Sequence, residues 1–276
     1  MDIQTALAHG VEALQAHSPS PRDDARRLLA HVLQCGTARL IAYEDHILDA
    51  ESERRFRALI GRRQQGEPVA YLTGRQGFWT LDLQVSPGVL IPRPETELLV
   101  ETALETLPTS AARVLDLGAG SGAVALALAK ERPAWEIVAT DCSADALKIA
   151  RQNRDALGLE RVRLLQGHWY EPLAGLAPFD LIVSNPPYVA AGDRHLQTGD
   201  LRFEPTEALV SGTSGLDALQ RIIGGAGAWL CTDGYLLVEH GFDQSASVSD
   251  RFRDAGFDEI TKLKDYAGHF RAVLGR

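Results

Sequence analysis

The spacing of apolar residues over the first quarter of the chain is that of helices. Leu7, Val11 and Leu14 recur every three or four positions, and the pattern repeats after Pro21, a residue favoured in the first helical turn. A third segment, 51–65, carries arginines on one face and Phe56, Leu59 and Ile60 on the other. Residues 2–66 therefore predict a small helical bundle, which Gly66-Glu67-Pro68 is expected to end.

Between residues 74 and 92 the spacing shortens toward alternation, which indicates strands. Phe78 to Val85 alternate in part, and Ser86-Pro87-Gly88 indicates a turn before Val89-Leu90-Ile91. This stretch predicts a β-hairpin that connects two parts of the chain. The Pro92-Arg93-Pro94 run that follows predicts the start of a helix over about 95–107.

From residue 113 onward, short apolar runs alternate with longer helical patterns. Strands are predicted at 113–117, 137–140, 162–165, 179–183 and 235–238, and helices at 123–130, 144–156 and 216–229. Two last runs, near 257–263 and 270–274, lie too close together for a helix to connect them, so they must pair antiparallel. Repeated β-α units form a parallel sheet that is covered on both faces. The predicted class is α/β, with a seven-stranded, mostly parallel sheet that ends in an antiparallel hairpin.

Composition and charge limit the classes of molecule that this chain is expected to bind. The chain has 276 residues and a formal net charge of −9, whereas proteins that bind long nucleic acids usually carry a basic face. We therefore expect a protein or small-molecule partner and no direct nucleic-acid binding. The three cysteines, Cys35, Cys142 and Cys231, lack the spacing of a metal site or a disulfide framework. Neither a signal peptide nor a long apolar run is present, so we expect a cytoplasmic protein without a membrane span or a metal.

A glycine-rich loop follows the first strand of the predicted sheet. Its residues are Gly118, Ala119, Gly120, Ser121 and Gly122, and Asp141 ends the next strand about 20 residues later. Ligands of open α/β sheets bind at this end of the strands, and the acidic residue suits ribose hydroxyls. The loop alone fits three interpretations: a turn without a ligand, a nicotinamide or flavin site, or a methyl-donor site. We favour the last because of a second motif.

That motif is Asn185-Pro186-Pro187-Tyr188, directly after the fourth strand. Proline has no N–H group, so the segment presents carbonyl acceptors without competing donors. The Asn185 side-chain oxygen and the Pro186 carbonyl can each accept one hydrogen of an –NH2 group, and Tyr188 offers a flat ring beside it. Such acceptors help an amide nitrogen reach the sp3-like geometry of a methylation transition state. Held in line with a methyl donor, this group becomes reactive.

At these residues the chain resembles the release-factor glutamine N5-methyltransferases, which are Class I S-adenosylmethionine-dependent enzymes. The resemblance runs the full length. It includes the N-terminal helices, the block Gly66-Glu67-Pro68-Val69-Ala70-Tyr71-Leu72-Thr73-Gly74, and the block Ile91-Pro92-Arg93-Pro94-Glu95-Thr96-Glu97. It implies a Class I methyltransferase sheet plus a small N-terminal helical domain. The terminal antiparallel hairpin is also an arrangement that this class has.

The resemblance also implies a substrate and roles for residues. The substrate would be the glutamine of the Gly-Gly-Gln motif in class 1 peptide chain release factors, with S-adenosylmethionine as donor and S-adenosylhomocysteine as product. Residues Gly118 to Gly122, Asp141, Trp169 and Asn185 would hold the donor, and Asn185 to Tyr188 the glutamine amide. The implied domains are 1–73 for substrate recognition, 74–92 as the hairpin connector and 93–276 for methyl transfer.

Several residues keep two interpretations. Arg93, Thr96 and Glu97 either line the active site or brace the helix that they begin. The family often has an acidic residue before the tryptophan, whereas this chain has His168, which we expect to be a solvated loop residue. We assign Glu239-His240 a loop role, because methyl transfer here needs no such pair.

Two other functions remain open on the sequence. The Asn-Pro-Pro-Tyr block also occurs in N6-adenine and N2-guanine methyltransferases, so an amino-group nucleic-acid methyltransferase is the alternative enzyme. A non-catalytic module that binds a release factor or the ribosome is the alternative without chemistry. The net negative charge is evidence against a nucleic-acid methyltransferase. The presence of Asp116, Asp141 and Asn185 is evidence against a non-catalytic module.

Overall fold

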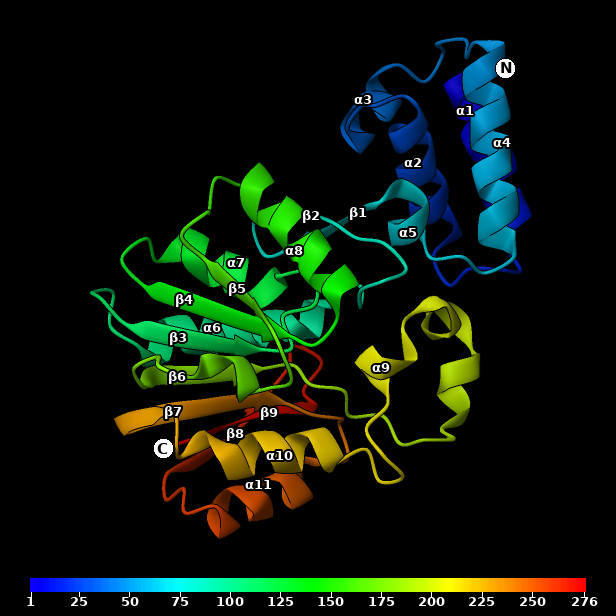
Figure 1. Cartoon of the computed structure of the whole chain (residues 1–276). Coiled ribbons are helices and arrows are strands. Elements are labelled where there is room, and N and C mark those ends of the chain that lie inside the picture. The colour runs from blue at the N-terminus through cyan, green and yellow to red at the C-terminus, as the bar shows by residue number, and fades with distance from the viewer. The chain divides into compact units, whose positions relative to one another are not determined.

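Helices form the N-terminal part of the chain in the computed structural model, which describes residues 1–276 (Figure 1). They are α1 (Ile3–Leu14), α2 (Pro21–Val32), α3 (Thr37–Ala42), α4 (Ala50–Gln64) and α5 (Val69–Thr73). The side chains of Asp2 and Asp49 cap α1 and α4 by accepting hydrogen bonds from the backbone N–H groups of Thr5 and Ser52. Pro21 occupies the first turn of α2. The predicted helical bundle is confirmed, but the helical part does not end at Gly66-Glu67-Pro68, because α5 begins directly after Pro68.

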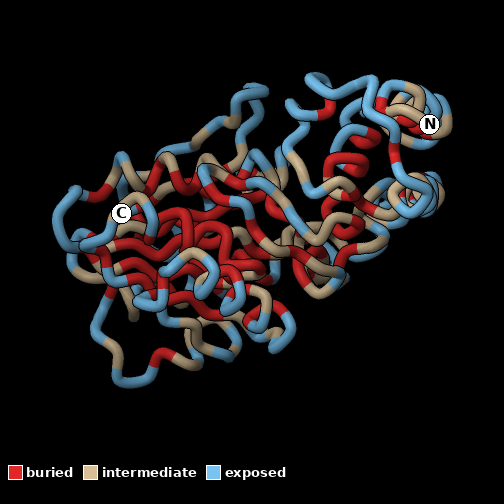
Figure 2. Tube along the Cα trace, turned by 90° about the horizontal axis from the view of Figure 1, so that it is seen from above, coloured by how far each residue is buried: buried red, intermediate tan, exposed pale blue.

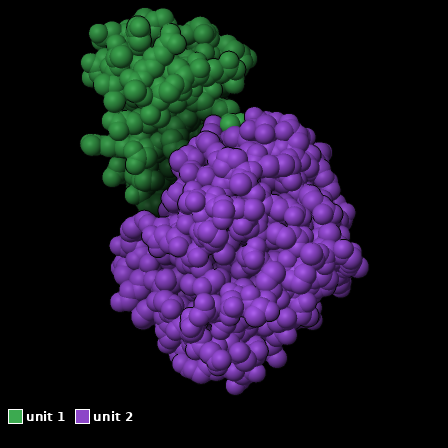
Figure 3. Space-filling model, turned by 90° about the vertical axis from the view of Figure 1, so that its left-hand side faces the viewer, with its two compact units in different colours: residues 1–75, 195–203 green, residues 76–194, 204–276 purple.

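These helices belong to the first of two compact units, which Figure 3 shows in green and purple. Unit 1 consists of residues 1–75 and 195–203, and unit 2 of residues 76–194 and 204–276. The segment 195–203, which the sequence analysis places within 93–276, is attached to unit 1 by Arg63. The buried Arg63 guanidinium pairs with Asp24 at 2.7 Å and with Asp200 at 2.8 Å. This pairing explains why so distant a segment packs with the helices.

Replacing Arg63 with methionine is expected to lower the free energy of unfolding of unit 1 by about 3–5 kcal/mol, because it leaves the Asp24 carboxylate buried and unpaired. Urea unfolding monitored by circular dichroism measures the loss. Arg57→Met is the matched control: Arg57 pairs with Glu53 at 2.8 Å on an exposed helix face, where such a pair contributes about 1 kcal/mol or less. Equal losses in the two variants would contradict the structural role of Arg63.

Unit 2 is built on a seven-stranded sheet whose strands follow the order β5-β4-β3-β6-β7-β9-β8. Their bounds are β3 (Arg113–Leu117), β4 (Glu136–Asp141), β5 (Arg163–Gln166), β6 (Phe179–Ser184), β7 (Leu230–Glu239), β8 (Ile260–Lys264) and β9 (Phe270–Gly275). The strands from β3 to β7 are parallel, while β9 runs antiparallel to both β7 and β8. The predicted mostly parallel sheet with a terminal antiparallel hairpin is confirmed.

Helices cover both faces of this sheet (Figure 1). One face carries α6 (Glu97–Thr106), α7 (Ala123–Glu131) and α8 (Ala144–Ala156), and the other carries α10 (Asp217–Ala226) and α11 (Ser245–Asp254). The central strands lie in the buried core, as the red trace in Figure 2 shows. Shorter elements are η1 (Pro94–Thr96), η2 (Glu171–Leu173), η3 (Arg194–Gln197), η4 (Gly199–Phe203) and α9 (Thr206–Leu209). The chain contains no helix that is both long enough and apolar enough to cross a membrane.

The hairpin before η1 differs from its prediction. It consists of β1 (Arg75–Phe78) and β2 (Leu81–Gln84), so the hairpin reverses at Trp79-Thr80. The turn expected at Ser86-Pro87-Gly88 is present, since the Val89 N–H donates to the Ser86 carbonyl at 3.0 Å, but no strand follows it. Trp79 adopts a positive φ of 55°, a conformation that glycine or asparagine normally signals and tryptophan does not. The prediction of a strand at Val89–Ile91 is therefore wrong. These residues form an irregular segment instead.

Candidate functional site

The loop between β3 and α7 is held open by its glycines. Gly118, Gly120 and Gly122 all have a positive φ, between 56° and 84°, which is costly for residues with a Cβ. The N–H groups of Gly118 and Ala119 donate to the Thr140 carbonyl at 2.8 and 3.0 Å. These bonds tie the loop to the end of β4, the neighbouring strand.

Two acidic residues stand at the ends of β3 and β4. The Asp141 carboxylate accepts hydrogen bonds from Gly120 N–H and Ser143 N–H, both at 2.8 Å, and burial raises its pKa. The Asp116 carboxylate accepts from Ala125 N–H at 3.1 Å. Burial, together with the charge of Asp141, raises the pKa of Asp116 to about 7. A cation bound beside them would stabilise both carboxylates in their charged form.

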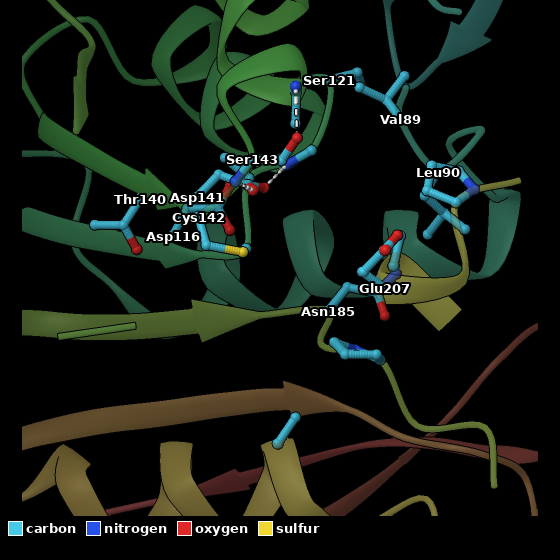
Figure 4. Close-up of a pocket in the computed structure, with 18 of the residues that line it drawn as sticks. Val89, Leu90, Asp116, Ser121, Thr140, Asp141, Cys142, Ser143, Asn185 and Glu207 are labelled. Atoms are coloured by element: carbon cyan, nitrogen blue, oxygen red, sulfur yellow. Dashed lines mark hydrogen bonds between the residues drawn. The ribbon is translucent and has the colours of Figure 1, made fainter. Parts of the chain in front are cut away.

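These residues border a cavity of about 730 Å³, within the range of small-molecule sites. Figure 4 shows Asp116, Asp141 and Ser143 gathered on one side of it, Val89 and Leu90 on another, and Asn185 below. The Trp169 ring lies against the backbone of Gly118, so it offers a flat wall near the loop. A cavity that combines a glycine loop, a carboxylate beside it and an aromatic wall suits a nucleoside-like ligand.

The second motif begins where β6 ends. The Ser184 hydroxyl donates to the Leu117 carbonyl at 2.6 Å, which ties β6 to β3 beside the glycine loop. Asn185 lies at the cavity, and its Nδ2 donates to Thr96 Oγ1 at 3.0 Å. Because the amide nitrogen is engaged there, the side-chain oxygen remains as an acceptor. Tyr188 is held from behind: its hydroxyl donates to Glu239 Oε1 at 3.1 Å and its carbonyl accepts from Gln244 Nε2 at 3.0 Å.

Most of the site residues expected from the sequence meet at this one cavity. Those that line it are Gly118, Ala119, Gly120, Ser121, Asp141, Trp169, Asn185, Pro187, Arg93 and Thr96. Those that do not are Gly122, Pro186, Tyr188 and Glu97. Glu97 accepts a hydrogen bond from Trp79 N–H at 2.7 Å and thus braces the hairpin. His168 is exposed in the loop after β5, as expected, and it is also among the residues that line the cavity.

Sequence reasoning missed one wall of the cavity and one buried group behind it. Residues between Pro205 and Arg221 form much of that wall, and their sequence carries no pattern that points to a ligand. The loop role expected for Glu239 and His240 is wrong, because both side chains are buried and Glu239 is the last residue of β7. The position of an acidic residue at the end of a central strand was the available signal.

Arg93 connects the segment before η1 to the cavity wall formed by residues 205–221. Its guanidinium pairs with the buried Glu204 carboxylate at 2.5 Å, next to Pro205. Arg93 therefore lines the cavity and also anchors the segment that begins at Glu204.

Comparison with known proteins identifies the family. Residues 5–74 match the profile described as PrmC N-terminal domain, and residues 94–212 match that described as Methyltransferase small domain. A release factor glutamine methyltransferase of Xylella fastidiosa (strain 9a5c) is 51% identical over 256 residues, which are 92% of this chain and 93% of the relative. Its namesake in Escherichia coli (strain K12) is 46% identical over 276 residues, 100% of this chain and 99% of the relative. The chain belongs to the release factor glutamine methyltransferase family.

Solved structures place this family member in a wide group of methyltransferase folds. A 16S rRNA methyltransferase of T. thermophilus, solved with AdoMet and guanosine, has a TM-score of 0.55 at 23% identity and covers 73% of this chain and 49% of its own. A methyltransferase of Pyrococcus furiosus has a TM-score of 0.54 at 18% identity and covers 78% and 95%, respectively. At these identities the likeness shows the fold alone.

Proposed function

We propose that this chain transfers a methyl group from S-adenosylmethionine to the N5 amide nitrogen of the glutamine in the Gly-Gly-Gln motif of class 1 peptide chain release factors. Family membership supports the substrate. The observation that carries the chemistry is that Asn185 lies on the same cavity as the glycine loop and Asp141, with its amide oxygen left as an acceptor.

The side chains around the cavity fit the methyl donor. Asp141 would hold the ribose hydroxyls, Trp169 would lie beside the adenine, and the backbone of the Gly118–Gly122 loop leaves room for close approach. Asp116 is a buried carboxylate at the cavity and would hold the ammonium group of the methionine part. The two raised pKa values fit this assignment, because a bound cation offsets the cost of two neighbouring buried carboxylates.

The donor supplies a methyl group on a sulfonium: the sulfur–carbon bond breaks as the nitrogen–carbon bond forms, the nitrogen loses one proton, and S-adenosylhomocysteine remains. The residues of the chain position the nucleophile. Asn185 Oδ1 and the Pro186 carbonyl would each accept one amide hydrogen, Pro187 would stiffen the turn, and Tyr188 would flank the planar group. Positioning of this kind can contribute up to ~7–11 kcal/mol to lowering a barrier.

Donor binding is expected to strengthen as pH rises from about 5.5 to about 7, because Asp116 becomes ionised over this range and the ionised form attracts the ammonium group. Below the pKa of about 7 the affinity should change by up to about tenfold per pH unit. Isothermal titration calorimetry measures it. Asp116→Asn is the control, and its affinity is expected to be lower and nearly independent of pH. A wild-type affinity that stays constant over this range would contradict the assignment of Asp116.

Unit 1 is the proposed recognition part for the body of the release factor. Its helices α2 and α4 expose the arginines Arg22, Arg26 and Arg55, which suit an acidic protein surface. We place this activity in the cytoplasm, where peptide chain release factors act.

The deciding experiment incubates the purified chain with S-adenosylmethionine and an unmethylated class 1 release factor. Peptide mapping by mass spectrometry is expected to show one added methyl group on the Gly-Gly-Gln glutamine. The same reaction with ribosomal RNA or DNA tests the alternative enzyme. Methyl incorporation into nucleic acid, with none into the release factor, would refute the proposal.

A further inference from the structure

A buried carboxylate stands directly behind the Asn-Pro-Pro-Tyr segment. Glu239 ends β7 and is 2% exposed, and it does not line the cavity. Its Oε1 accepts the hydrogen bond from the Tyr188 hydroxyl at 3.1 Å. The Thr96 side chain also lowers the pKa of this carboxyl group, and Oε2 has no hydrogen-bond partner. Glu239 therefore joins two side chains from different elements, η1 and the loop after β6.

Thr96 connects Glu239 to Asn185. A hydroxyl has a single hydrogen, and an ionised carboxylate can only accept. Next to a charged Glu239 the hydrogen of Thr96 is drawn toward the carboxylate, which leaves the lone pairs of Oγ1 for Asn185. Asn185 Nδ2 donates to that oxygen at 3.0 Å. The carbonyl end of the amide is then the end that remains for a ligand in the cavity.

The direction of this chain of hydrogen bonds matters for chemistry. The side-chain oxygen of Asn185 can accept a hydrogen bond from an –NH2 group. If the amide were reversed, its nitrogen would face that group, and two donors cannot form a hydrogen bond with each other. If residue 239 could donate, the Thr96 hydrogen would be free to turn toward Asn185 and favour the reversed amide. The charge on residue 239 thus selects which face Asn185 shows to its substrate.

We infer that Glu239 is a positioning residue for methyl transfer, which fixes the direction of the Asn185 amide through Thr96 and clamps Tyr188 from behind. This inference rests on the proposed function, since it assumes that an amide –NH2 group is the nucleophile. It gives a role in the reaction to a residue that does not line the donor cavity.

The path from Glu239 through Thr96 to Asn185 is called the relay below. The groups around Glu239 set the pH range in which this relay keeps its direction. Burial raises its pKa to about 7, and Glu95 on η1 adds to the rise. Thr96, Tyr188 and Arg271 on β9 favour the charged form. As pH falls below about 7 the carboxyl group takes up a proton and can donate toward Thr96, so the direction of the relay is lost.

The test is the isosteric variant Glu239→Gln, assayed by release-factor methylation at saturating S-adenosylmethionine. We expect kcat to fall by about 10–100-fold, as is typical when the partner that orients a functional side chain is lost. Donor affinity by calorimetry should stay within about twofold, since Glu239 does not line the cavity. Wild-type kcat should decline below about pH 7, and the variant should lack this decline. Glu239→Asp, which keeps the charge, should retain more activity than Glu239→Gln.

Two further variants keep the inference testable if Glu239→Gln fails to fold. Thr96→Val removes the hydroxyl at nearly constant volume and should cause a similar loss of kcat. The double variant should be no slower than the slower single one, because both changes break the same relay. The control is Glu101→Gln. Glu101 also accepts from a tyrosine hydroxyl (Tyr266, 3.0 Å), but this tyrosine lies outside the Asn185–Tyr188 segment, so the variant should leave kcat unchanged.

The outcomes separate the two proposals. A wild-type chain that leaves the release factor unmethylated refutes the proposed function. If the wild type is active while Glu239→Gln or Thr96→Val keeps kcat within about threefold, only the relay is refuted. Additive losses in the double variant, or a wild-type pH profile that persists in Glu239→Gln, would also overturn it.

Discussion

Asn185→Ala is expected to lower kcat for release-factor methylation by about 10²–10³-fold, the range seen when one aligned polar group is removed from a reacting centre. The substitution removes the side-chain oxygen that is proposed to accept an amide hydrogen, and it also removes the hydrogen bond to Thr96. Both losses act on the geometry of the nucleophile. Single-turnover kinetics with labelled methyl donor measure the chemical step.

The control for this variant is Gln152→Ala, which removes an exposed side-chain amide from α8 and should leave the rate unchanged. Thermal unfolding of both variants shows whether the fold is kept. A rate for Asn185→Ala within about fivefold of the wild type would remove the chemical basis of the proposed function.

Gly215→Ala is expected to lower kcat by about 100-fold, although Gly215 lies outside both motifs and does not line the cavity. Its φ is +75°, and a Cβ there would overlap the Tyr188 carbonyl oxygen and stand 2.9 Å from Gln244 Nε2 and 3.1 Å from Ala190 N. The Tyr188 carbonyl accepts from that Gln244 nitrogen, so it has little freedom to move away. The Asn185–Tyr188 segment must shift instead, and a misplacement of about 1 Å can cost 10²-fold.

Gly224→Ala is the matched control. A Cβ at Gly224 meets nothing within 4 Å, and the residue lies inside α10, where alanine is the better helix former. This variant should keep full activity and melt no lower than the wild type. If Gly215→Ala behaves in the same way, the segment tolerates displacement and the claim of rigid positioning is wrong.

The parts of the fold that were predictable are those whose pattern is local. Strands β3 and β4 are apolar runs followed by a glycine loop and by an acidic residue, and such signals need no tertiary context. Pairing the glycine loop with Asn185 was possible because parallel strands bring their carboxyl ends to one edge of the sheet. The structure places both at one cavity.

The parts that were missed depend on tertiary context. The reversal at Trp79 lacks glycine or asparagine, and its bracing by Glu97 comes from another element. Helix α11 was not predicted because only Val248 and Phe252 mark its apolar face among serines and charges. The buried state of Glu239 follows from its neighbours in the sheet and not from its own sequence environment.

The path of the backbone limits how this protein can be divided. After Arg194 the chain leaves unit 2, contributes residues 195–203 to unit 1, and returns to unit 2 at Glu204, next to Pro205 in the cavity wall. A fragment that begins at residue 76 would carry this excursion without Arg63, the partner of Asp200. Exchanging the helical part between relatives by a single cut near residue 75 would therefore pair the segment 195–203 with helices from another protein.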